Sequence, residues 1–290
     1  MIIMFATSCN VVKRVSENQH LLTQTNVKVN GKSNNTEAIN NLLVQKNNST
    51  VFNYPLRLHI FNLARDNKDS IFEAWLDKNP KRRERLTKKL SLKQLHQLKQ
   101  SSLNFNNWIK TTGEAPVILD SLKTLKSKNN LEKYFFANGW FNRKVSFEID
   151  RKENKRATVS YFVDSGKPYK LDTISSTIVS PEIDKLYKKT RKKSLLIKGN
   201  QFKAVDFENE RERLTSEFRN SGVYHFSQDY IRFENDTIGT NKKVNVNVQI
   251  QNRIIRNEDS ISRVPFNIYK IRDVNIVTDD AFENRGKPYL

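Results

Sequence analysis

Apolar and polar residues alternate along two neighbouring stretches in the middle of the chain. The first stretch runs from Lys144 to Ile149 and the second from Ala157 to Val163, with a charged turn at 150–156 between them. Because successive side chains of a strand point to opposite faces, this period of two places one face of each strand on a core. The pattern predicts a β-hairpin. Gly139 precedes it, and a glycine there is typical of the left-handed residue that ends a helix.

The same pattern recurs further along the chain. Residues 206–221 predict a helix that ends before Gly222, with Phe218 on its apolar face. Val244–Ile250 alternates as the earlier strands do, and we expect Phe218 to pack against it. A strand is also expected over Val223–Phe233.

That expected strand carries its apolar residues in two phases. Tyr224, Phe226 and Tyr230 share one face, whereas Ile231 and Phe233 share the other. A strand whose apolar side changes face midway needs an extra residue, so a β-bulge is expected between the two parts.

The elements upstream of each hairpin give two units of one order. A strand at 26–30 and a helix capped by Thr36 open the first unit, and residues 120–138 predict one or two helices before its hairpin. In the second unit a strand at 169–178 precedes a helix whose first position is Pro181. Both units therefore have the order strand, helix, helix, strand, strand, which predicts an α+β fold.

These elements set the expected domain boundaries. Residues 1–19 are interpreted as a leader and tether, 20–165 as the first unit and 166–252 as the second. The first unit differs by a polar, helix-rich insertion at about 47–116, which we expect to pack on that unit.

A third unit is expected to begin after the second. The polar stretch 251–265 predicts a linker, and the apolar positions of 266–277 predict a strand. Residues 253–290 are thus interpreted as a linker and the start of an incomplete unit, so the chain is expected to be the front of a longer protein.

Two helices carry runs of cations. Within the insertion, Ser70 and Ser91 have capping-box spacing and predict helix starts. The first basic run lies between them, and the second follows the helix that begins at Pro181. The predicted basic patch consists of Lys81, Arg82, Arg83, Arg85, Lys88, Lys89, Lys188, Lys189, Arg191, Lys192 and Lys193. For the first run two interpretations stay open: a solvated helix face, or contact with phosphates or anionic headgroups. The second run lies at a helix C-terminus, where its cations complement the helix dipole, and that role alone could account for it.

The charge balance favours an anionic partner. The 290 residues include 51 lysines and arginines against 31 acidic residues, which gives a formal net charge of +20. Such a charge favours nucleic acid, lipid headgroups or an acidic polymer without choosing among them. No stretch of the sequence reaches the ~18–20 apolar residues of a transmembrane helix.

The lone cysteine, Cys9, follows an apolar N-terminal stretch and the small residues Ala6, Thr7 and Ser8. This arrangement resembles a bacterial lipobox, in which the cysteine becomes the acylated first residue of the mature chain. It predicts a lipid anchor at Cys9. The alternative is a small buried cysteine, since the apolar stretch is shorter than the usual ~7–15 residues and lacks a basic start.

Residues that enzymes commonly use are scattered. His20, His59, His96 and His225 lie far apart, without the spacing of metal ligands. Phosphate loops, serine-hydrolase elbows and zinc-protease motifs are absent from the sequence. The sequence therefore predicts no catalytic residues, no metal and no cofactor, and we do not expect an enzyme.

The repeated element order, with glycine and an aromatic residue after the second helix, resembles the polypeptide-transport-associated (POTRA) domain. Tandem POTRA domains precede the membrane barrel in the BamA/TamA superfamily of outer-membrane assembly proteins. Three stretches resemble more specifically the TamL lipoproteins of Bacteroidetes-type bacteria. They are Ser8-Cys9-Asn10, Tyr54-Pro55-Leu56-Arg57-Leu58 and Phe105-Asn106-Asn107-Trp108. The resemblance extends from Cys9 to about Thr278 and does not include a barrel.

The resemblance implies a periplasmic scaffold at the outer membrane, held by the lipid on Cys9. It implies unfolded outer-membrane proteins as clients and a C-terminal β-barrel of the full-length protein as a further partner. It leaves room for an accessory periplasmic or inner-membrane subunit.

Clients would bind by β-augmentation, in which an extended chain adds a strand to an open sheet edge. In the family the last strand pairs with both others, so the open edges would be Trp140–Glu148 and Val223–Phe233. We expect the second to bind better, because the insertion is expected to cover the sheet of the first unit. The expected client-binding edge consists of Val223, Tyr224, Phe226, Gln228, Tyr230, Ile231 and Phe233.

The alternative function is that of a basic nucleic-acid-binding protein, which the net charge of +20 suggests. Against it, the basic runs lie on predicted helices without interleaved aromatic residues, and no groove-reading motif appears. A lipid anchor would also place the chain outside the cytoplasm. Nucleic acid is therefore the less favoured partner.

Overall fold

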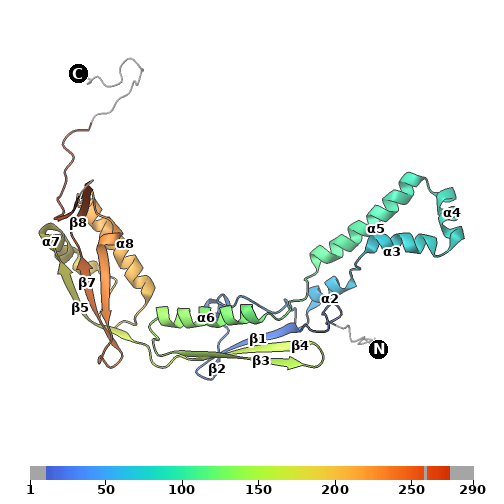
Figure 1. Ribbon diagram of the computed structural model, residues 1–290, viewed down its shortest axis with the longest axis horizontal. Coiled ribbons are helices and arrows are strands. Elements are labelled where there is room, and N and C mark those ends of the chain that lie inside the picture. The colour runs from blue at the N-terminus through green and yellow to red at the C-terminus, as the bar shows by residue number, and fades with distance from the viewer. Residues whose placement is uncertain (1–10, 258–259, 275–290) are drawn as a thin grey trace, which may run out of the picture. The chain divides into compact units, whose positions relative to one another are not determined.

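The computed structural model describes residues 11–257 and 260–274 (Figure 1). They form two compact units, one made of residues 11–135 and 142–166 and the other of residues 136–141 and 167–274. Each unit has its own sheet and its own helices, which confirms the predicted α+β class.

The sheet of the first unit has the strand order β2-β1-β4-β3. Its strands are β1 (Leu21–Val29), β2 (Lys32–Ser33), β3 (Lys144–Lys152) and β4 (Arg156–Asp164). β4 pairs in parallel with β1 and antiparallel with β3, in the hairpin that the alternating pattern predicts. The last strand of the unit therefore lies between the other two long strands.

One helix, α6 (Ser121–Ala137), lies over this sheet (Figure 1). The leucine period slips in its sequence, which left one or two helices open. A single helix forms because small polar residues continue the buried face: Thr124 and Ser127 are buried in line with Leu131 and Phe135. Each of the two hydroxyls donates to the carbonyl oxygen four residues earlier, so its burial leaves no donor unsatisfied.

The insertion follows the short helix α1 (Glu37–Asn40). It consists of α2 (Leu56–Leu63), α3 (Lys68–Asp77), α4 (Pro80–Lys89) and α5 (Leu92–Thr112), which contact mainly one another. α5 begins at the predicted capping box, where Ser91 and Gln94 each accept the backbone N–H of the other. The other predicted box is wrong, because Ser70 lies inside α3 and the helix begins just after Asn67.

The insertion meets the sheet at its base. Leu58 of α2 packs in a small cluster that includes Leu21 at the start of β1. The two ends of the insertion are joined side by side, since the Asn48 amide donates to the Ala115 carbonyl and the Ser49 backbone N–H donates to the Glu114 carboxylate.

The second unit has the same element order without an insertion. β5 (Lys170–Ile178) leads to α7 (Pro181–Thr190), the 3₁₀ turn η1 (Arg191–Lys193) and α8 (Ala204–Asn220). β6 (Ile231–Asp236) and β7 (Lys243–Ile250) form the hairpin that follows. The strand order is β5-β7-β6, with β7 parallel to β5 and antiparallel to β6, so the last of these strands is again central.

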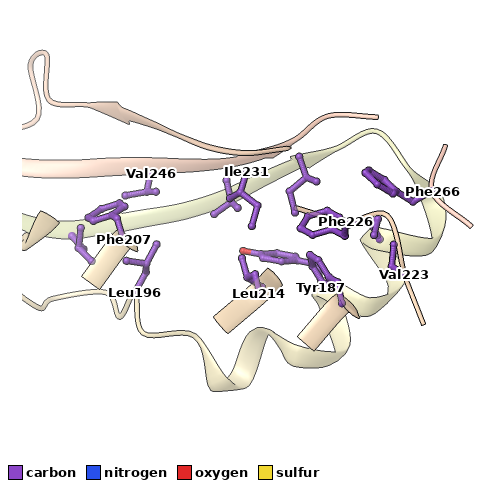
Figure 2. Packing of buried hydrophobic residues seen from close by; sticks show 14 of the residues in the cluster. Tyr187, Leu196, Phe207, Leu214, Val223, Phe226, Ile231, Val246 and Phe266 are labelled. Atoms are coloured by element: carbon purple, nitrogen blue, oxygen red, sulfur yellow. The ribbon is translucent and has the colours of Figure 1, made fainter. Parts of the chain in front are cut away.

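The core of the second unit lies between its helices and its sheet (Figure 2). Phe218 of α8 is fully buried and shares this core with Val246 and Val248 of β7, as predicted. Its ring packs edge-on against that of Phe226, with the ring centroids 4.9 Å apart. Leu214 and Tyr187 come from the helix side and Val246 and Ile231 from the sheet side of the same core (Figure 2).

A carboxylate is buried beside this core. Glu210 of α8 is only 1% exposed, and its oxygens accept hydrogen bonds from the Arg213 guanidinium, the Ser194 hydroxyl and the Leu195 backbone N–H. Arg213 also donates to the Thr190 hydroxyl at the end of α7. Burial of a charge is costly unless it is paired and hydrogen-bonded, and here both oxygens have partners. The network ties α8 to α7 and to the loop between them.

The strand predicted over Val223–Phe233 begins only at Ile231. α8 ends at Asn220 and is closed by a Schellman arrangement at Gly222: the backbone N–H of Val223 donates to the Phe218 carbonyl, and that of Gly222 to the Arg219 carbonyl. Val223 and Phe226 then turn inward and are buried in the core. The expected bulge is replaced by a 3₁₀ turn, η2 (Gln228–Tyr230).

The segment after β7 also differs from prediction. Residues 251–265 are not a linker throughout but include a hairpin of β8 (Arg253–Asn257) and β9 (Ser260–Val264). Residues 266–274 form no strand, and the rest of the predicted third unit lies outside the described residues. Phe266 is instead buried in the second core. The Tyr269 backbone N–H donates to the Gly222 carbonyl oxygen at 2.7 Å.

Replacing Phe218 with alanine is expected to lower the free energy of unfolding by roughly 3–5 kcal/mol, because the cavity forms in a fully buried core. Ile238→Ala is the control, since Ile238 is 88% exposed and its truncation empties no core. Chemical denaturation measures both variants. Equal midpoints for Phe218→Ala and the parent chain would contradict the placement of this side chain.

Replacing Gly222 with alanine is expected to destabilise the second unit by more than the backbone conformation alone explains. Gly222 has a φ of +94°, and an added Cβ would lie 2.5 Å from the Tyr269 carbonyl oxygen. Gly239 has a φ of +66° and nothing within 4 Å of such a Cβ, so Gly239→Ala is the matched control. The control is expected to lose about 1–2 kcal/mol from the left-handed conformation. Equal losses in a denaturation series would show that Tyr269 is not held on Gly222.

Candidate functional site: two open sheet edges

Each sheet has the first strand of its hairpin at an edge. β3 lies at one edge of the first sheet and β6 at one edge of the second, because the central strands β4 and β7 pair with β1 and β5 on their other sides. A strand at an edge presents unpaired backbone N–H and C=O groups, which form a template for another extended chain.

The register shows which groups of β6 point outward. The Ile250 carbonyl of β7 accepts from Val179, on the β5 side, so its antiparallel partner Ile231 is not hydrogen-bonded to it. Since such pairs alternate, Phe233 and Asn235 also present their N–H and C=O groups to the open side. Arg232 and Glu234 use theirs for β7.

The same reasoning applies to β3. The Val163 carbonyl of β4 accepts from Asn30, on the β1 side, so its partner Val145 presents its backbone groups outward. Phe147, Ile149 and Arg151 follow in the same phase. β3 has nine residues and β6 has six, so the first unit offers the longer open edge.

The predicted client-binding residues occupy three different settings. Ile231 and Phe233 lie on the edge strand β6. Gln228 and Tyr230 lie on η2, before the strand. Val223 and Phe226 are buried, whereas Tyr224 is exposed and lies edge-on to Tyr269. The sequence therefore placed the edge too early, because an apolar run that closes the end of the core has the composition of a strand.

A basic hollow adjoins the start of β6. It has a volume of about 600 Å³ and is lined in part by Arg232 of β6, Arg256 of β8 and Arg263 of β9. Asp229 is the acidic residue at its wall. The sequence does not predict this cluster, because Arg256 and Arg263 lie on a hairpin whose sequence predicts a linker.

The first predicted basic run lies on α4, and half of its cations are engaged within the insertion. Arg83 forms ion pairs with Glu73 and Asp77 of α3, and these hydrogen bonds raise its pKa above the ordinary value. Arg82 lies over the Trp75 ring, 4.8 Å from its centroid, and Lys88 pairs with Glu84 one turn away. Within the described residues no side-chain partner is seen for the remaining cations of this run. They are Lys81, Arg85 and Lys89.

The second run, at the end of α7 and on η1, is similar. Lys188 pairs with Asp184 at 2.6 Å, Lys193 with Glu217 at 3.7 Å, and Arg191 donates to the Ile174 carbonyl. Lys189 and Lys192 have no side-chain partner within the part of the chain that the structure describes.

The remaining candidate residues form no common site. Cys9 lies outside the described residues. Across residues 11–257 and 260–274, no group of histidine, cysteine, aspartate and glutamate side chains gathers as metal ligands would. No helix of that part is long and apolar enough to cross a bilayer.

Comparison with known proteins finds likeness in structure only. No protein-family model and no curated protein matches the sequence. The chain is similar to POTRA domains 3–5 of Haemophilus influenzae BamA, with 10% identity and a TM-score of 0.34 over 82% of this chain and 68% of that one.

POTRA domains of Omp85 from Anabaena are also similar to it. Domains 1–3 share 13% identity at a TM-score of 0.25, over 80% of this chain and 65% of that one. Domains 1–2 share 10% identity at a TM-score of 0.30, over 81% of this chain and 98% of that one. The solved structures named here are thus POTRA domains, but likenesses at such scores establish no family membership.

Backbone amide exchange is expected to alternate along β6. The N–H groups of Phe233 and Asn235 point to the open side and should exchange quickly, whereas those of Arg232 and Glu234 are bonded to β7 and should be protected. Residue-resolved hydrogen exchange by NMR measures this. Uniform protection along the strand would show that the edge is covered, and the opposite alternation would show a register shifted by one residue.

Proposed function

We propose that this chain is the periplasmic POTRA scaffold of a TamL-like outer-membrane assembly lipoprotein. It receives unfolded outer-membrane proteins by β-augmentation and passes them to a C-terminal β-barrel of the full-length protein. The lipid on Cys9 anchors the chain to the outer membrane. An accessory periplasmic or inner-membrane subunit is proposed as a further partner of the chain.

The observation that carries the proposal is the open edge that recurs in both units. Backbone groups of β3 and β6 point outward at alternate residues, and the paired central strands hold each edge in extended form. A client chain that adds there gains main-chain hydrogen bonds whatever its side chains are. This suits a scaffold that must receive many different unfolded sequences.

Both edges are proposed to take part. Stronger client binding by the second unit is expected only if the insertion covers the sheet of the first unit. The insertion contacts that sheet at the Leu21 end of β1. α6 covers a face of that sheet and leaves the edge strand β3 outermost in the order. The proposed client strand in the second unit is β6 itself, from Ile231 to Asp236, in place of the longer stretch expected from the sequence.

The nucleic-acid alternative receives no support from the basic runs. Ion pairs with Glu73, Asp77, Glu84 and Asp184 engage several of these cations. A phosphate-binding surface would instead keep its cations available for the phosphate backbone.

Site-specific photocrosslinking tests the proposed function. A photoreactive residue replaces Ser146 or Glu148 on β3, or Arg232 or Glu234 on β6, and the probe is an unfolded segment of an outer-membrane β-barrel protein. These side chains lie beside the outward backbone groups, so crosslinks are expected at all four positions and at high as well as low salt. In a second set of variants the photoreactive residue replaces Arg85 or Lys192. Crosslinks confined to these two positions and lost at high salt would contradict the proposal, because charge alone would then recruit the client.

Variants of Asn235 test whether the backbone carries the binding. Asn235→Pro removes one outward N–H while the ladder to β7 keeps its bonds, and an edge strand tolerates proline there. The loss of one hydrogen bond is expected to weaken client binding about fivefold, equivalent to ~1 kcal/mol. Asn235→Ala keeps the N–H and is the matched control. Equal binding by the two variants, with both shown to be folded by circular dichroism, would contradict a main-chain mechanism.

A further inference from the structure

A hollow of about 390 Å³ lies in the first unit where the start of the sheet meets the base of the insertion. Its apolar lining comes from Leu21 and Leu22 of β1, Leu58 of α2 and Val11 of the segment before the sheet. These residues are buried, so the apolar lining is a fixed part of the core of this unit. A hollow of this size that combines apolar walls with polar groups is typical of a small-molecule site.

The hollow is lined by one cation and no carboxylate. Arg156, at the start of β4, is among its lining residues, and its side chain has no hydrogen-bond or ion-pair partner within residues 11–257 and 260–274. By contrast, the Asn48 side chain at the same wall is satisfied, since it donates to Ala115 and accepts from Val117. Arg156 is exposed, so its guanidinium meets solvent and is accessible to a ligand.

Two stacked aromatic rings line another side of the hollow. The rings of Tyr54 and His59 are stacked, with centroids 4.5 Å apart and planes 8° from parallel. Burial lowers the pKa of His59 below its ordinary value, so the imidazole is neutral at pH 7. The hollow therefore offers one positive charge, a neutral hydrogen-bonding ring and an apolar lining.

We propose that this hollow binds a small amphipathic monocarboxylate, with its hydrocarbon body against Leu21, Leu22 and Leu58 and its carboxylate paired with Arg156. A guanidinium matches the two oxygens of a carboxylate with two parallel N–H groups. A single cation beside a neutral histidine favours a monoanion over a phosphate dianion. None of the residues that line the hollow belongs to β3 or β6, so the proposal adds a second binding activity to that of the open edges.

Octanoate is the probe, and octan-1-ol is the same chain without the charge. Arg156→Gln removes the proposed counter-ion, and Lys152→Gln is the matched control because Lys152 pairs with Arg156 across the hairpin but does not line the hollow. Binding is followed by chemical shifts of Leu21, Leu22 and Leu58 methyl groups in the whole chain. Arg156→Gln is expected to weaken octanoate binding about tenfold and to leave octan-1-ol unchanged, whereas Lys152→Gln changes neither.

Three results would overturn the proposal. One is the absence of octanoate-induced shifts at these methyl groups. Another is equal weakening of octanoate by Arg156→Gln and Lys152→Gln, which would mean a general charge effect. The third is octanoate binding only by a chain that lacks residues 1–9, which would make the chain's own N-terminal residues the occupant.

Discussion

The parallel pairing between the first and last strands of each unit is the constraint on which the rest of the structure depends. Parallel strands cannot be joined by a tight turn, so a helical crossover must connect β1 to β4 and β5 to β7. The crossover supplies the helices that cover one face. It also places the last strand in the centre, where both of its sides are bonded. The hairpin partner, β3 or β6, is thereby left at an edge.

This constraint explains which parts of the fold the sequence predicts well. The central strands are bonded on both sides and half-buried, so Ala157–Val163 and Val244–Ile250 alternate cleanly. The glycines that end α6 and α8 have positive φ values, a requirement that glycine meets without strain. Local chemistry and tertiary structure agree at these positions, and the element order follows from them.

The wrong predictions have one physical cause: the composition of a segment does not show which of its side chains the folded protein buries. Val223 and Phe226 have the composition of a strand but close the end of the core between the helices and the sheet of the second unit. Thr124 and Ser127 are polar yet continue the buried face of α6, because their hydroxyls bond to their own helix. Phe266 belongs to the second core although it follows a polar stretch.

The candidate sites divide in the same way. The open edges could be predicted from the element order together with the pairing that the family resemblance implies, although the start of β6 could not. The hollow beside Arg156 could not be predicted, because its walls come from four separated stretches of chain that only the folded sheet brings together. The partners of Arg83 were hidden for the same reason, since they lie on a neighbouring helix of the insertion.

The joined ends of the insertion have a consequence for how the chain folds. Thr23 and Ala157, bonded across the first sheet, are 134 residues apart, whereas Ser175 and Val246 of the second are 71 apart. Closing a longer loop costs more chain entropy and slows the formation of a sheet. The insertion contacts mainly itself, and its bonds at Asn48 and Ser49 bring together positions 67 and 65 residues apart. Once these helices form and the ends of the insertion are joined, the insertion no longer adds to the loop that must close between β1 and β4. The effective loop in the first unit is then about as long as the loop between β5 and β7 in the second.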